Sequence, residues 1–523
     1  MPLLQLRVFR ALLIATLISN IGEWMEDVGE TWLMTSLHGT PLMVALVQSS
    51  ASLPVFLFAL PAGTLADIVD RRRLLLVTQV WSLLVAALLG ALTLTFHIKA
   101  WGLLGCTFAM GIGSALEGPA WEAVLADVVP RSELARATVL NGVAFNLGRV
   151  VGPALGGLVV AWAGPGAVFL LNAVTFVLVI VEIARWKRPH HPSLLPAERL
   201  WTGIRTGLRY VREAPSLRTV LLRTFAVLVC ASALWALLPS LVRRALHGTP
   251  SDYGLLLGAL GAGALAGAGL LSKIRTPVSV DAILIPATVV LAVGIAGLAF
   301  APTLAWAALA TFVCGVAWLA LSSASMGAAQ KSSADWVRAR ALAVFLLVSE
   351  GAMALGSLAW GWLATRTSER FALGWAAVGV AASLAVAFTR RLRDLDTVDR
   401  TPVGIYPIPE APRGIDEEES PVVVEIEYRV DPAQRRAFRQ TLERLGRSRR
   451  RTGAALWLLT EDSHDPTRFL EIFFIESWNE HLRQHARWTK SDEALWRHAR
   501  TLVTPGTEPK VTHLVGALPP RSE

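Results

Sequence analysis

Four carboxylates lie close together inside the first strongly apolar stretch of the chain. This stretch reads SNIGEWMEDVGETW, residues 19–32, and it holds Glu23, Glu26, Asp27 and Glu30. Crowded carboxylates in a poorly hydrated site share protons, so one of them can bind and release a proton near neutral pH. The same group attracts cations electrostatically. Which of these it does depends on the element that carries it.

The composition indicates that this element is a membrane helix. The chain has 523 residues, of which 53% are hydrophobic and 17% are charged, and its mean hydropathy is +0.49. Soluble domains are nearer to about 25% charged. Runs such as 74–96, 165–184 and 282–300 are almost free of charge, and about 20 helical residues cross roughly 30 Å of hydrocarbon. We therefore predict an all-α, multi-pass protein of the lipid bilayer.

In a helix over residues 10–37, the four carboxylates share one face. At about 100° per residue, Asp27 lies near +40°, Glu30 near −20° and Glu26 near −60° from Glu23. A charge near the bilayer centre costs roughly 2.5 to 3.5 kcal/mol, so the stripe is expected to face a water-filled cavity. The alternative is that these acids form structural ion pairs or line an outer vestibule.

Three further charges interrupt apolar spans. Arg149 lies halfway along the fifth predicted helix and is a candidate counter-ion, Glu350 is central in the eleventh, and Glu117 lies in the fourth. The predicted proton-coupling and substrate-binding set is Glu23, Glu26, Asp27, Glu30, Arg149 and Glu350. Six tryptophans either line a site for a flat ligand or, more commonly, anchor helices at the interface. These are Trp24, Trp32, Trp121, Trp235, Trp318 and Trp360.

Other reactive residues give no sign of an enzyme. The three cysteines fall inside apolar spans, where a thiol behaves as a small hydrophobe, so no disulfide or metal motif is indicated. His481 and His485 are spaced i, i+4, as in zinc sites, but no third ligand is evident. A solvated helix face is the favoured interpretation of that pair. No catalytic group, no metal and no cofactor is predicted.

The apolar runs predict about twelve membrane helices. Their ranges are 10–37, 42–66, 73–96, 100–124, 134–162, 164–186, 219–245, 253–273, 279–300, 303–328, 338–364 and 370–389. Arg and Lys collect in alternate connections, which explains the net charge of +9 without a nucleic-acid partner. The asymmetry predicts that both termini and the long central loop are cytoplasmic.

The chain divides into a membrane domain and a soluble domain. Residues 1–395 form the membrane domain, with halves 1–186 and 219–395 joined by a loop at 187–218. Residues 200–211 of that loop are amphipathic, which fits a helix on the inner membrane face or a solvated linker helix. A Pro- and acid-rich linker covers 396–420, and residues 421–517 read as βαββαβ. That order predicts a cytosolic α+β ferredoxin-like domain whose open sheet could pair with a second copy.

An offset of about 204 residues brings similar residues of the two halves together. The matches include Arg136 with Arg340, Gly152 with Gly356 and Gly157 with Gly361. Two related six-helix halves are typical of transporters that bind their substrate between the halves.

Two motifs carry a resemblance to a known superfamily. GTLADIVDRRR, residues 63–73, resembles the loop between helices two and three of the major facilitator superfamily. Gly63, Asp67, Arg71 and Arg72 match it, whereas Ile68 and Asp70 replace a basic residue and a glycine. The resemblance implies that Asp67 latches the cytoplasmic side. The alternative is a positive-inside loop with a helix-capping Asp.

The second motif is more specific. GRVVGPALGG, residues 148–157, matches the fifth-helix signature G-x-x-x-G-P-x-x-G-G of proton-coupled exporters of the same superfamily. The matching residues are Gly148, Gly152, Pro153, Gly156 and Gly157. Glycines at this spacing let a neighbouring helix approach closely, and the proline bends the span. The resemblance implies export; the alternative is a packing face with no transport polarity.

Over about residues 5–395 the chain looks like the secretion-effector-type branch of the superfamily, and the segment ESWNEHLRQHARWT resembles antibiotic-biosynthesis-monooxygenase-like domains. The resemblance implies a cytoplasmic-membrane secondary transporter that exchanges protons for a small amphipathic drug, siderophore or secondary metabolite. The alternatives are a proton-coupled importer, or a protein whose C-terminal domain acts as an oxygenase or ligand sensor.

Overall fold

The computed structural model describes residues 3–37, 39–130, 133–186, 200–272, 278–392, 398–401, 403 and 420–516. The chain forms two compact units. Unit 1 consists of residues 1–200, 219–327 and 343–392, and unit 2 consists of residues 201–218, 328–342 and 393–523.

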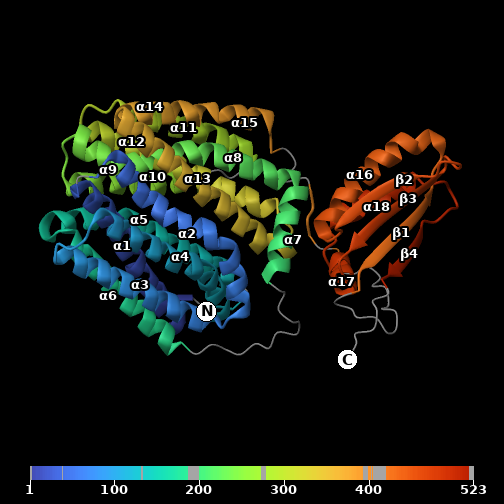
Figure 1. Ribbon diagram of the computed structural model, residues 1–523, viewed down its shortest axis with the longest axis horizontal. Helices are drawn as coiled ribbons and strands as arrows, with labels where there is room; N and C mark the ends of the chain where they lie inside the picture. Colours follow the sequence, from blue (N-terminus) through green and yellow to red (C-terminus); the bar gives the residue numbers. More distant parts are fainter. Residues whose placement is uncertain are drawn as a thin grey trace. The chain divides into compact units, whose positions relative to one another are not determined.

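The N-terminal half of unit 1 is a bundle of long helices, which run side by side in Figure 1. They are α1 (Arg7–Ser36), α2 (Pro41–Ile68), α3 (Arg71–Leu94), α4 (Ala100–Val128), α5 (Leu134–Ala163) and α6 (Pro165–Arg185). Local signals fix their ends. The Thr40 side chain accepts a hydrogen bond from the Met43 amide at the start of α2, which has Pro41 in its first turn. Gly164, at φ +80°, separates α5 from α6.

The C-terminal half repeats this arrangement with more interruptions. Its helices are α8 (Pro215–Ala231), α9 (Ala233–Ser240), α10 (Pro250–Ser272), α11 (Val280–Ala299), α12 (Leu304–Lys331), α13 (Arg338–Arg366), α14 (Glu369–Ala382) and α15 (Leu384–Thr389). The span predicted as one helix at 219–245 is α8, α9 and a π-helical turn at Leu241–Ala245. The all-α membrane architecture is confirmed, because eleven helices within the described residues are long and apolar enough to cross a bilayer.

The glycines matched by the internal offset occupy equivalent packing positions. A Cβ atom built on Gly152 of α5 would lie 2.8 Å from the Ile21 carbonyl oxygen of α1, and one on Gly356 of α13 would lie 2.2 Å from the Val229 carbonyl oxygen of α8. Gly157 likewise faces α10, and Gly361 faces α2. Each half thus uses its fifth helix to approach the first helix of its own half and one helix of the other half.

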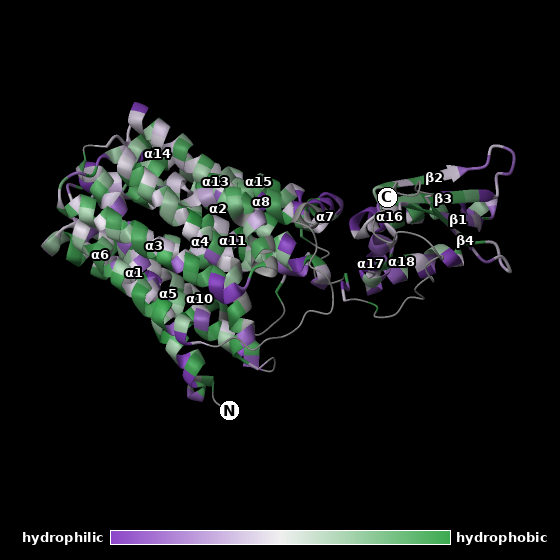
Figure 2. Ribbon diagram, turned by 60° about the horizontal axis from the view of Figure 1, so that its bottom comes forward, coloured by the Kyte–Doolittle hydropathy of each residue, from purple (hydrophilic) through white to green (hydrophobic). Residues whose placement is uncertain are grey.

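Hydrophobic residues, green in Figure 2, are distributed along the helices of the bundle, and large apolar side chains of α3 and α6 are exposed. Val77 is 67% exposed, Leu84 61% and Val174 60%, on helices α3 and α6. Water would not favour so many exposed apolar side chains, whereas hydrocarbon does. The surface therefore agrees with the predicted multi-pass membrane protein.

The C-terminal part of unit 2 is an antiparallel sheet with helices. Its elements are β1 (Val422–Arg429), α16 (Arg435–Thr452), β2 (Leu456–Glu461), β3 (Arg468–Ile475), α17 (Trp478–Ala486), α18 (Lys490–Thr501) and β4 (Lys510–Val515). The strand order is β2-β3-β1-β4, which is the ferredoxin-like order expected from βαββαβ. Alternate residues of β1 are buried, among them Val422, Val424 and Ile426, and they form a core with Phe438 and Phe473.

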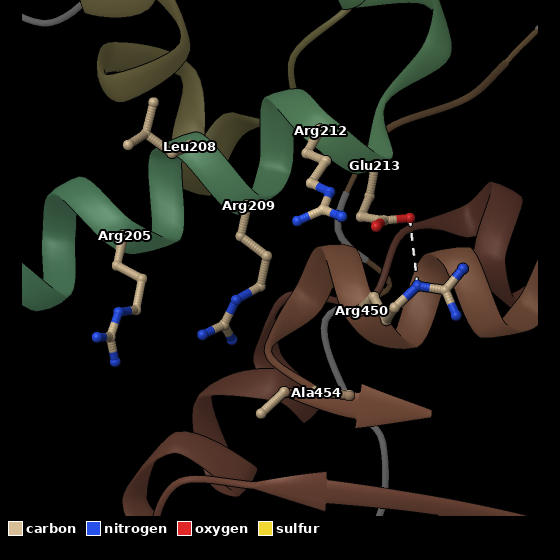
Figure 3. A pocket seen from close by; sticks show the side chains of 8 residues that line it. Arg205, Leu208, Arg209, Arg212, Glu213, Arg450 and Ala454 are labelled. Atoms are coloured by element: carbon tan, nitrogen blue, oxygen red, sulfur yellow. Dashed lines mark ion pairs between the residues drawn. The ribbon is translucent and has the colours of Figure 1, made fainter. Parts of the chain in front are cut away.

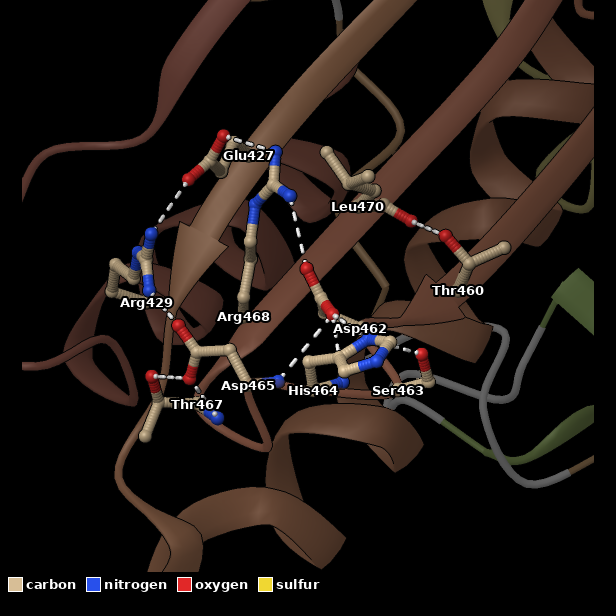
Figure 4. Close-up of polar contacts among 10 residues, drawn as sticks. All are labelled: Glu427, Arg429, Thr460, Asp462, Ser463, His464, Asp465, Thr467, Arg468 and Leu470. Atoms are coloured by element: carbon tan, nitrogen blue, oxygen red, sulfur yellow. Dashed lines mark hydrogen bonds and ion pairs between the residues drawn. The ribbon is translucent and has the colours of Figure 1, made fainter.

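A network of ion pairs ties the exposed ends of these strands together (Figure 4). Arg468 pairs with Glu427 at 3.0 Å and with Asp462 at 3.0 Å, and Arg429 pairs with Asp465. The hydrogen bond from Arg468 lowers the pKa of the Glu427 carboxyl. The pKa of Asp462 is lowered first by the hydrogen bond from the His464 amide and then by Arg468. These charged groups keep the strand ends polar.

The amphipathic segment of the central loop forms α7 (Leu200–Glu213), and most of it packs within unit 2. The buried Tyr210 hydroxyl donates to the Ser332 carbonyl oxygen at 3.1 Å and accepts from the Ala334 amide at 3.0 Å. Arg209 donates to the Gly453 carbonyl oxygen at 2.6 Å. The sequence predicted either a helix on the inner membrane face or a solvated linker helix, and neither interpretation included these partners. The apolar pattern of one helix does not say which part of the chain packs against it.

Candidate functional site

A cavity of about 600 Å³ lies between the two halves of unit 1. Helices α1, α2 and α5 of the first half and α8, α9, α11, α12, α13 and α15 of the second half contribute its walls. Its polar and aromatic lining residues include Trp24, Asp27, Gln48, Asn146, Arg149, Arg223, Thr224, Trp235, Thr288, Trp318, Ser322, Ser349 and Glu350. Volumes of roughly 300 to 1,000 Å³ are typical of small-molecule sites.

The acidic face of α1 is divided between two environments. Asp27 is exposed and lines the cavity. Glu26 is 4% exposed and Glu30 5% exposed, and both lie inside the N-terminal half. Residues one apart differ by about 100° around a helix, so neighbouring acids reach different compartments. The sequence placed all four acids on one face, and the structure brings only Asp27 of the four to the cavity wall.

The other acids of α1 have partners inside the N-terminal half. Glu26 accepts a hydrogen bond from the Asn172 amide of α6. Glu23 accepts from the Ser19 hydroxyl at 3.2 Å and is an electrostatic neighbour of Glu117 on α4. Glu30 is hydrogen-bonded with Thr107, also on α4. The interior of this half thus holds several carboxyl groups, from α1 and α4.

Arg149 lies at the cavity wall and is 8% exposed. Its guanidinium carbon lies 5.5 Å from the centroid of the Trp24 ring, a cation–π contact. Among the described residues no carboxylate forms an ion pair with it, and its Nε atom has no hydrogen-bond partner there. Arg149 is therefore a buried positive charge that lines the same cavity as the Asp27 carboxylate.

Glu350 belongs to the same cavity but comes from α13 of the opposite half. It is hydrogen-bonded with Ser52 of α2, and Ser52 in turn accepts from the Gln48 amide at 3.3 Å. Trp235 and Trp318 form a pair with ring centroids 4.2 Å apart on another wall. The cavity thus combines carboxylates from two halves with aromatic faces. Trp32, Trp121 and Trp360 are not among its lining residues.

Arg223 is a lining residue that the sequence did not single out. It lies in α8, is 6% exposed, and pairs with Asp281 of α11. Asp281 also accepts from the Leu392 amide at 3.1 Å. The feature of the sequence that could have identified Arg223 is its position inside the apolar run LLRTFAVL. The sequence shows no partner for it, because Asp281 lies 58 residues further along the chain.

The two halves meet at the end of the bundle where α1 ends and α10 begins. Arg243 donates to the hydroxyls of Thr35 at 3.2 Å and Ser36 at 3.0 Å. Arg244 donates to the Gly39 carbonyl oxygen at 2.7 Å. At the other end, the cavity lining reaches Val220 near the start of α8 and Leu392 after α15. The cavity therefore extends toward the end of the bundle where α8 begins.

The glycine motif of α5 packs against the helix that carries the acids. Cβ atoms built on Gly148, Gly152 and Gly156 would lie 2.8 Å, 2.6 Å and 2.9 Å from atoms of Asn20, Trp24 and Met25. A Cβ on Gly157 would lie 2.8 Å from the Pro250 carbonyl oxygen of α10. The motif, with Pro153 inside the helix, thus joins α1 to the seam between the halves.

The loop motif is described only in part. Of Gly63, Ala66, Asp67 and Ile68 only the helical backbone is described. Arg71 pairs with Asp127 of α4 at 3.2 Å, and Arg72 donates to the Ile183 carbonyl oxygen of α6 at 3.1 Å. Asp70, where the motif has glycine, caps α3 by accepting from the Arg73 amide at 2.9 Å.

In unit 2, His481 and His485 lie beside a third histidine. The His481 and His485 Nε2 atoms are 3.3 Å apart, and the His481 and His513 ring centroids are 5.0 Å apart. Burial lowers the pKa of His481 to about 3 and that of His485 to about 4, with neighbouring positive charge adding to the effect. His481 is 1% exposed, so the predicted solvated face is wrong for this residue. Within the described residues, no group of His, Cys, Asp and Glu side chains could hold a metal ion.

Two halves built of long apolar helices enclose a central cavity, and this architecture is that of a membrane transporter of the major facilitator fold. A solved bacterial homolog of the human lysosomal transporter Spinster, inward-facing and unoccupied, shares this fold, with a TM-score of 0.61 at 15% identity over 75% of this chain and 97% of that chain.

The chain belongs to the transmembrane secretion effector family, whose profile matches residues 1–520. It is 26% identical to the multidrug efflux pump Tap of Mycolicibacterium fortuitum, over 74% of this chain and 97% of that protein. It is 29% identical to the Tap pump of Mycobacterium tuberculosis H37Rv, over 66% and 84%. It is 23% identical to the staphyloferrin A transporter of Staphylococcus aureus, over 49% and 64%.

Proposed function

We propose that this protein exports small amphipathic cations in exchange for protons. The observation that carries the proposal is the cavity between the halves, where Asp27 and Glu350 stand with Trp24, Trp235 and Trp318. Carboxylates attract a cation, and aromatic faces bind flat apolar surface and cations alike. Relatives named multidrug efflux pumps support the direction and the class of cargo.

The proposed orientation puts both termini, α7 and the C-terminal domain in the cytoplasm of a cell membrane. It rests on the arginines and lysines that collect in alternate connections. In this orientation the cavity extends toward the cytoplasm, where a pump collects its cargo, and the contacts of Arg243 and Arg244 close the outer end.

Exchange requires that one site hold either the proton or the cargo. We assign this site to Asp27, since it is exposed to the cavity and shares α1 with Glu23, Glu26 and Glu30. A cation that enters the cavity displaces the proton from Asp27, and reprotonation releases the cation after the halves rock to open outward. Glu23, Glu26, Glu30 and Glu117 provide carboxyl groups next to this path. Arg149, Arg223 and Glu350 are the other charged residues of the lining.

Import is the alternative direction, and an anionic metallophore is the alternative cargo. The staphyloferrin A transporter is a relative, and Arg149 and Arg223 would contact an anion in the same cavity. The carboxylates of Asp27 and Glu350 in the cavity lining favour the cation.

A second candidate function concerns the C-terminal domain. Trp478 and His481 are each 1% exposed, and the Trp478 Nε1 and His481 Nδ1 atoms have no hydrogen-bond partner among the described residues. Buried polar atoms of this kind could contact a small ligand, so an oxygenase or ligand-sensing role follows from the resemblance of this domain to monooxygenase-like domains. Dimerisation through the sheet is a third role. Turnover or ligand binding by the purified chain would separate these roles.

The export proposal is tested with inverted membrane vesicles under an imposed pH gradient, with a fluorescent cationic dye added to the outer medium. Wild type should accumulate dye inside the vesicles when the interior is acidic, and Asp27→Asn should not. Expression of the variant at wild-type level is the control. Accumulation driven by the opposite gradient would support import, and equal accumulation by Asp27→Asn would remove Asp27 from the coupling path.

A further inference from the structure

A second hollow, unrelated to the central cavity, lies within unit 2 between α7 and the C-terminal domain (Figure 3). Its volume is about 920 Å³. Its walls are Arg205, Leu208, Arg209, Arg212 and Glu213 of α7, together with Arg450, Ala454 and Ala455. The α7 arginines recur at three- and four-residue intervals, which places their side chains on one face of the helix.

The positive charge of this hollow exceeds its negative charge. Glu213 pairs with Arg450 at 3.3 Å. Glu476, which is outside the lining, pairs with Arg209 at 3.1 Å and Arg205 at 3.4 Å. Two carboxylates thus face four guanidinium groups. The Arg212 side chain is exposed and has no partner among the described residues.

The arginines of the hollow differ in exposure. Arg209 is held by its hydrogen bond to the Gly453 carbonyl oxygen at 2.6 Å, and its side chain is 17% exposed. The Arg205 side chain, which also pairs with Glu476, is 71% exposed, so its guanidinium is accessible to a ligand. A planar guanidinium matches the paired oxygens of a phosphate group. Arg209, together with the more exposed Arg205 and Arg212, therefore presents several donors to one phosphate.

α7 is followed directly in the chain by a membrane span. Glu213 ends α7, and the candidate membrane span Pro215–Ala245 begins two residues later. Leu208, one of the lining residues, is 48% exposed. Arginines close in sequence to the cytoplasmic end of a span attract the phosphates of anionic lipids, in which cytoplasmic leaflets are rich.

We infer that Arg205, Arg209, Arg212 and Arg450 form a binding site for a phosphate-bearing anion, either the head group of an anionic phospholipid or a soluble phosphate ester. The site joins the helix between the two halves to the C-terminal domain. The assignment of the phosphate to a lipid head group rests on the proposed cytoplasmic orientation of α7. The assignment of a phosphate-binding site does not depend on that orientation.

The test uses the purified full chain in an uncharged detergent. One arm measures the anisotropy of fluorescent phosphatidylglycerol against fluorescent phosphatidylcholine. The other arm measures inorganic pyrophosphate by calorimetry. Preference for phosphatidylglycerol identifies a head-group site, and binding of pyrophosphate alone identifies a soluble phosphate ester. Neither arm reads transport, so failure here leaves the export proposal standing, and failure of export leaves this site standing.

Variants locate the binding. Arg205→Gln with Arg212→Gln should weaken binding of the active probe by about tenfold, whereas Arg444→Gln, an exposed arginine on α16 outside the hollow, should not. Glu476→Gln frees Arg205 and Arg209 and should tighten binding by about threefold, a gain that misfolding cannot produce. Absence of binding in both arms, or unchanged binding in the double variant, would overturn the inference.

Discussion

At the scale of single residues, the central result is that neighbouring acids of α1 face different surroundings. Asp27 is exposed to the cavity, whereas Glu26 is buried against Asn172. The sequence predicted that the whole stripe faces a water-filled cavity, whereas only Asp27 of the four acids lines the cavity. Helix angles alone could not divide the stripe between a cavity and the interior of one half. That division depends on where α4, α5 and α6 pack around α1.

Glu350 should contribute to binding of a cationic cargo, because it lines the cavity from the half opposite Asp27. A carboxylate near a cation contributes a few kcal/mol at an effective dielectric constant of about 20. Glu350→Gln should therefore weaken binding of a cationic dye by at least about tenfold, measured by quenching of tryptophan fluorescence.

Glu26→Gln is the matched comparison for this variant. It removes a carboxylate of unit 1 that does not line the cavity, and the new amide can still accept a hydrogen bond from Asn172. Its dye affinity should stay within about twofold of wild type. Equal losses in the two variants would show that the charge of the whole region, and not the cavity lining, sets affinity.

At the scale of elements, the glycine motif explains how α5 holds α1 and α10 at short distance. A Cβ atom on Gly157 would lie 2.8 Å from the Pro250 carbonyl oxygen and 3.0 Å from the Gly254 Cα atom. Gly157→Ala should therefore separate α5 from α10, lower the stability of the protein by about 1 to 3 kcal/mol and reduce transport. Thermal unfolding in detergent would measure the first effect.

Gly142→Ala, on the same helix, provides the control because a Cβ atom there meets nothing within 4 Å. It should leave the melting temperature unchanged or raise it slightly, since alanine favours the helical state. If Gly157→Ala were as harmless as Gly142→Ala, the motif would not be a close-packing device.

The histidine cluster makes the C-terminal domain sensitive to acid. Burial lowers the pKa of His481 to about 3 and that of His485 to about 4, whereas histidine in an unfolded chain titrates near about 6.5. The unfolded state therefore binds protons first, and the stability of the domain is complete above about pH 6.5 and falls as the pH drops toward 4.

Hydrogen–deuterium exchange of β1 and β3, corrected for intrinsic rates, would follow this loss of stability. Protection should decrease between pH 7 and pH 5, and His481→Leu should reduce that decrease. Protection that is the same at both pH values in wild type would contradict the assignment of two neutral, buried histidines.

Element boundaries were predictable where local chemistry sets them. The Thr40–Pro41 and Gly164–Pro165 pairs mark helix starts in the sequence, and the structure has helices starting at Pro41 and Pro165. The break of the seventh span at Ser232 and its π-helical turn at Leu241 have no such signal, because packing against neighbouring helices decides them. The partners of α7 were unpredictable for the same reason.

At the scale of the whole molecule, the contacts of Arg243 and Arg244 close one end of the seam, and the cavity extends toward the other. With the proposed orientation, Ser322→Cys in the cavity wall should react with a membrane-impermeant maleimide from the cytoplasmic side only. Phe96→Cys, at the α3–α4 connection, where Phe96 is 94% exposed, should react from outside only. Reversed labelling of the pair would invert the topology.

The two related halves were visible in the sequence through Gly152 and Gly356 and through Gly157 and Gly361, and the structure gives each pair equivalent neighbours. The composition likewise predicted a multi-pass bundle. The pairing of Arg223 with Asp281 and the union of α7 with the C-terminal domain required coordinates, since both join segments that are distant in sequence and carry no shared pattern.

The central claim is that the cavity carboxylate of Asp27 holds either a proton or a cationic cargo. The most direct test is to count protons released when a cationic dye binds to the purified protein in weakly buffered detergent solution. The account predicts proton release on dye binding by wild type and none by Asp27→Asn. Dye binding by wild type without proton release, or equal release by Asp27→Asn, would contradict it.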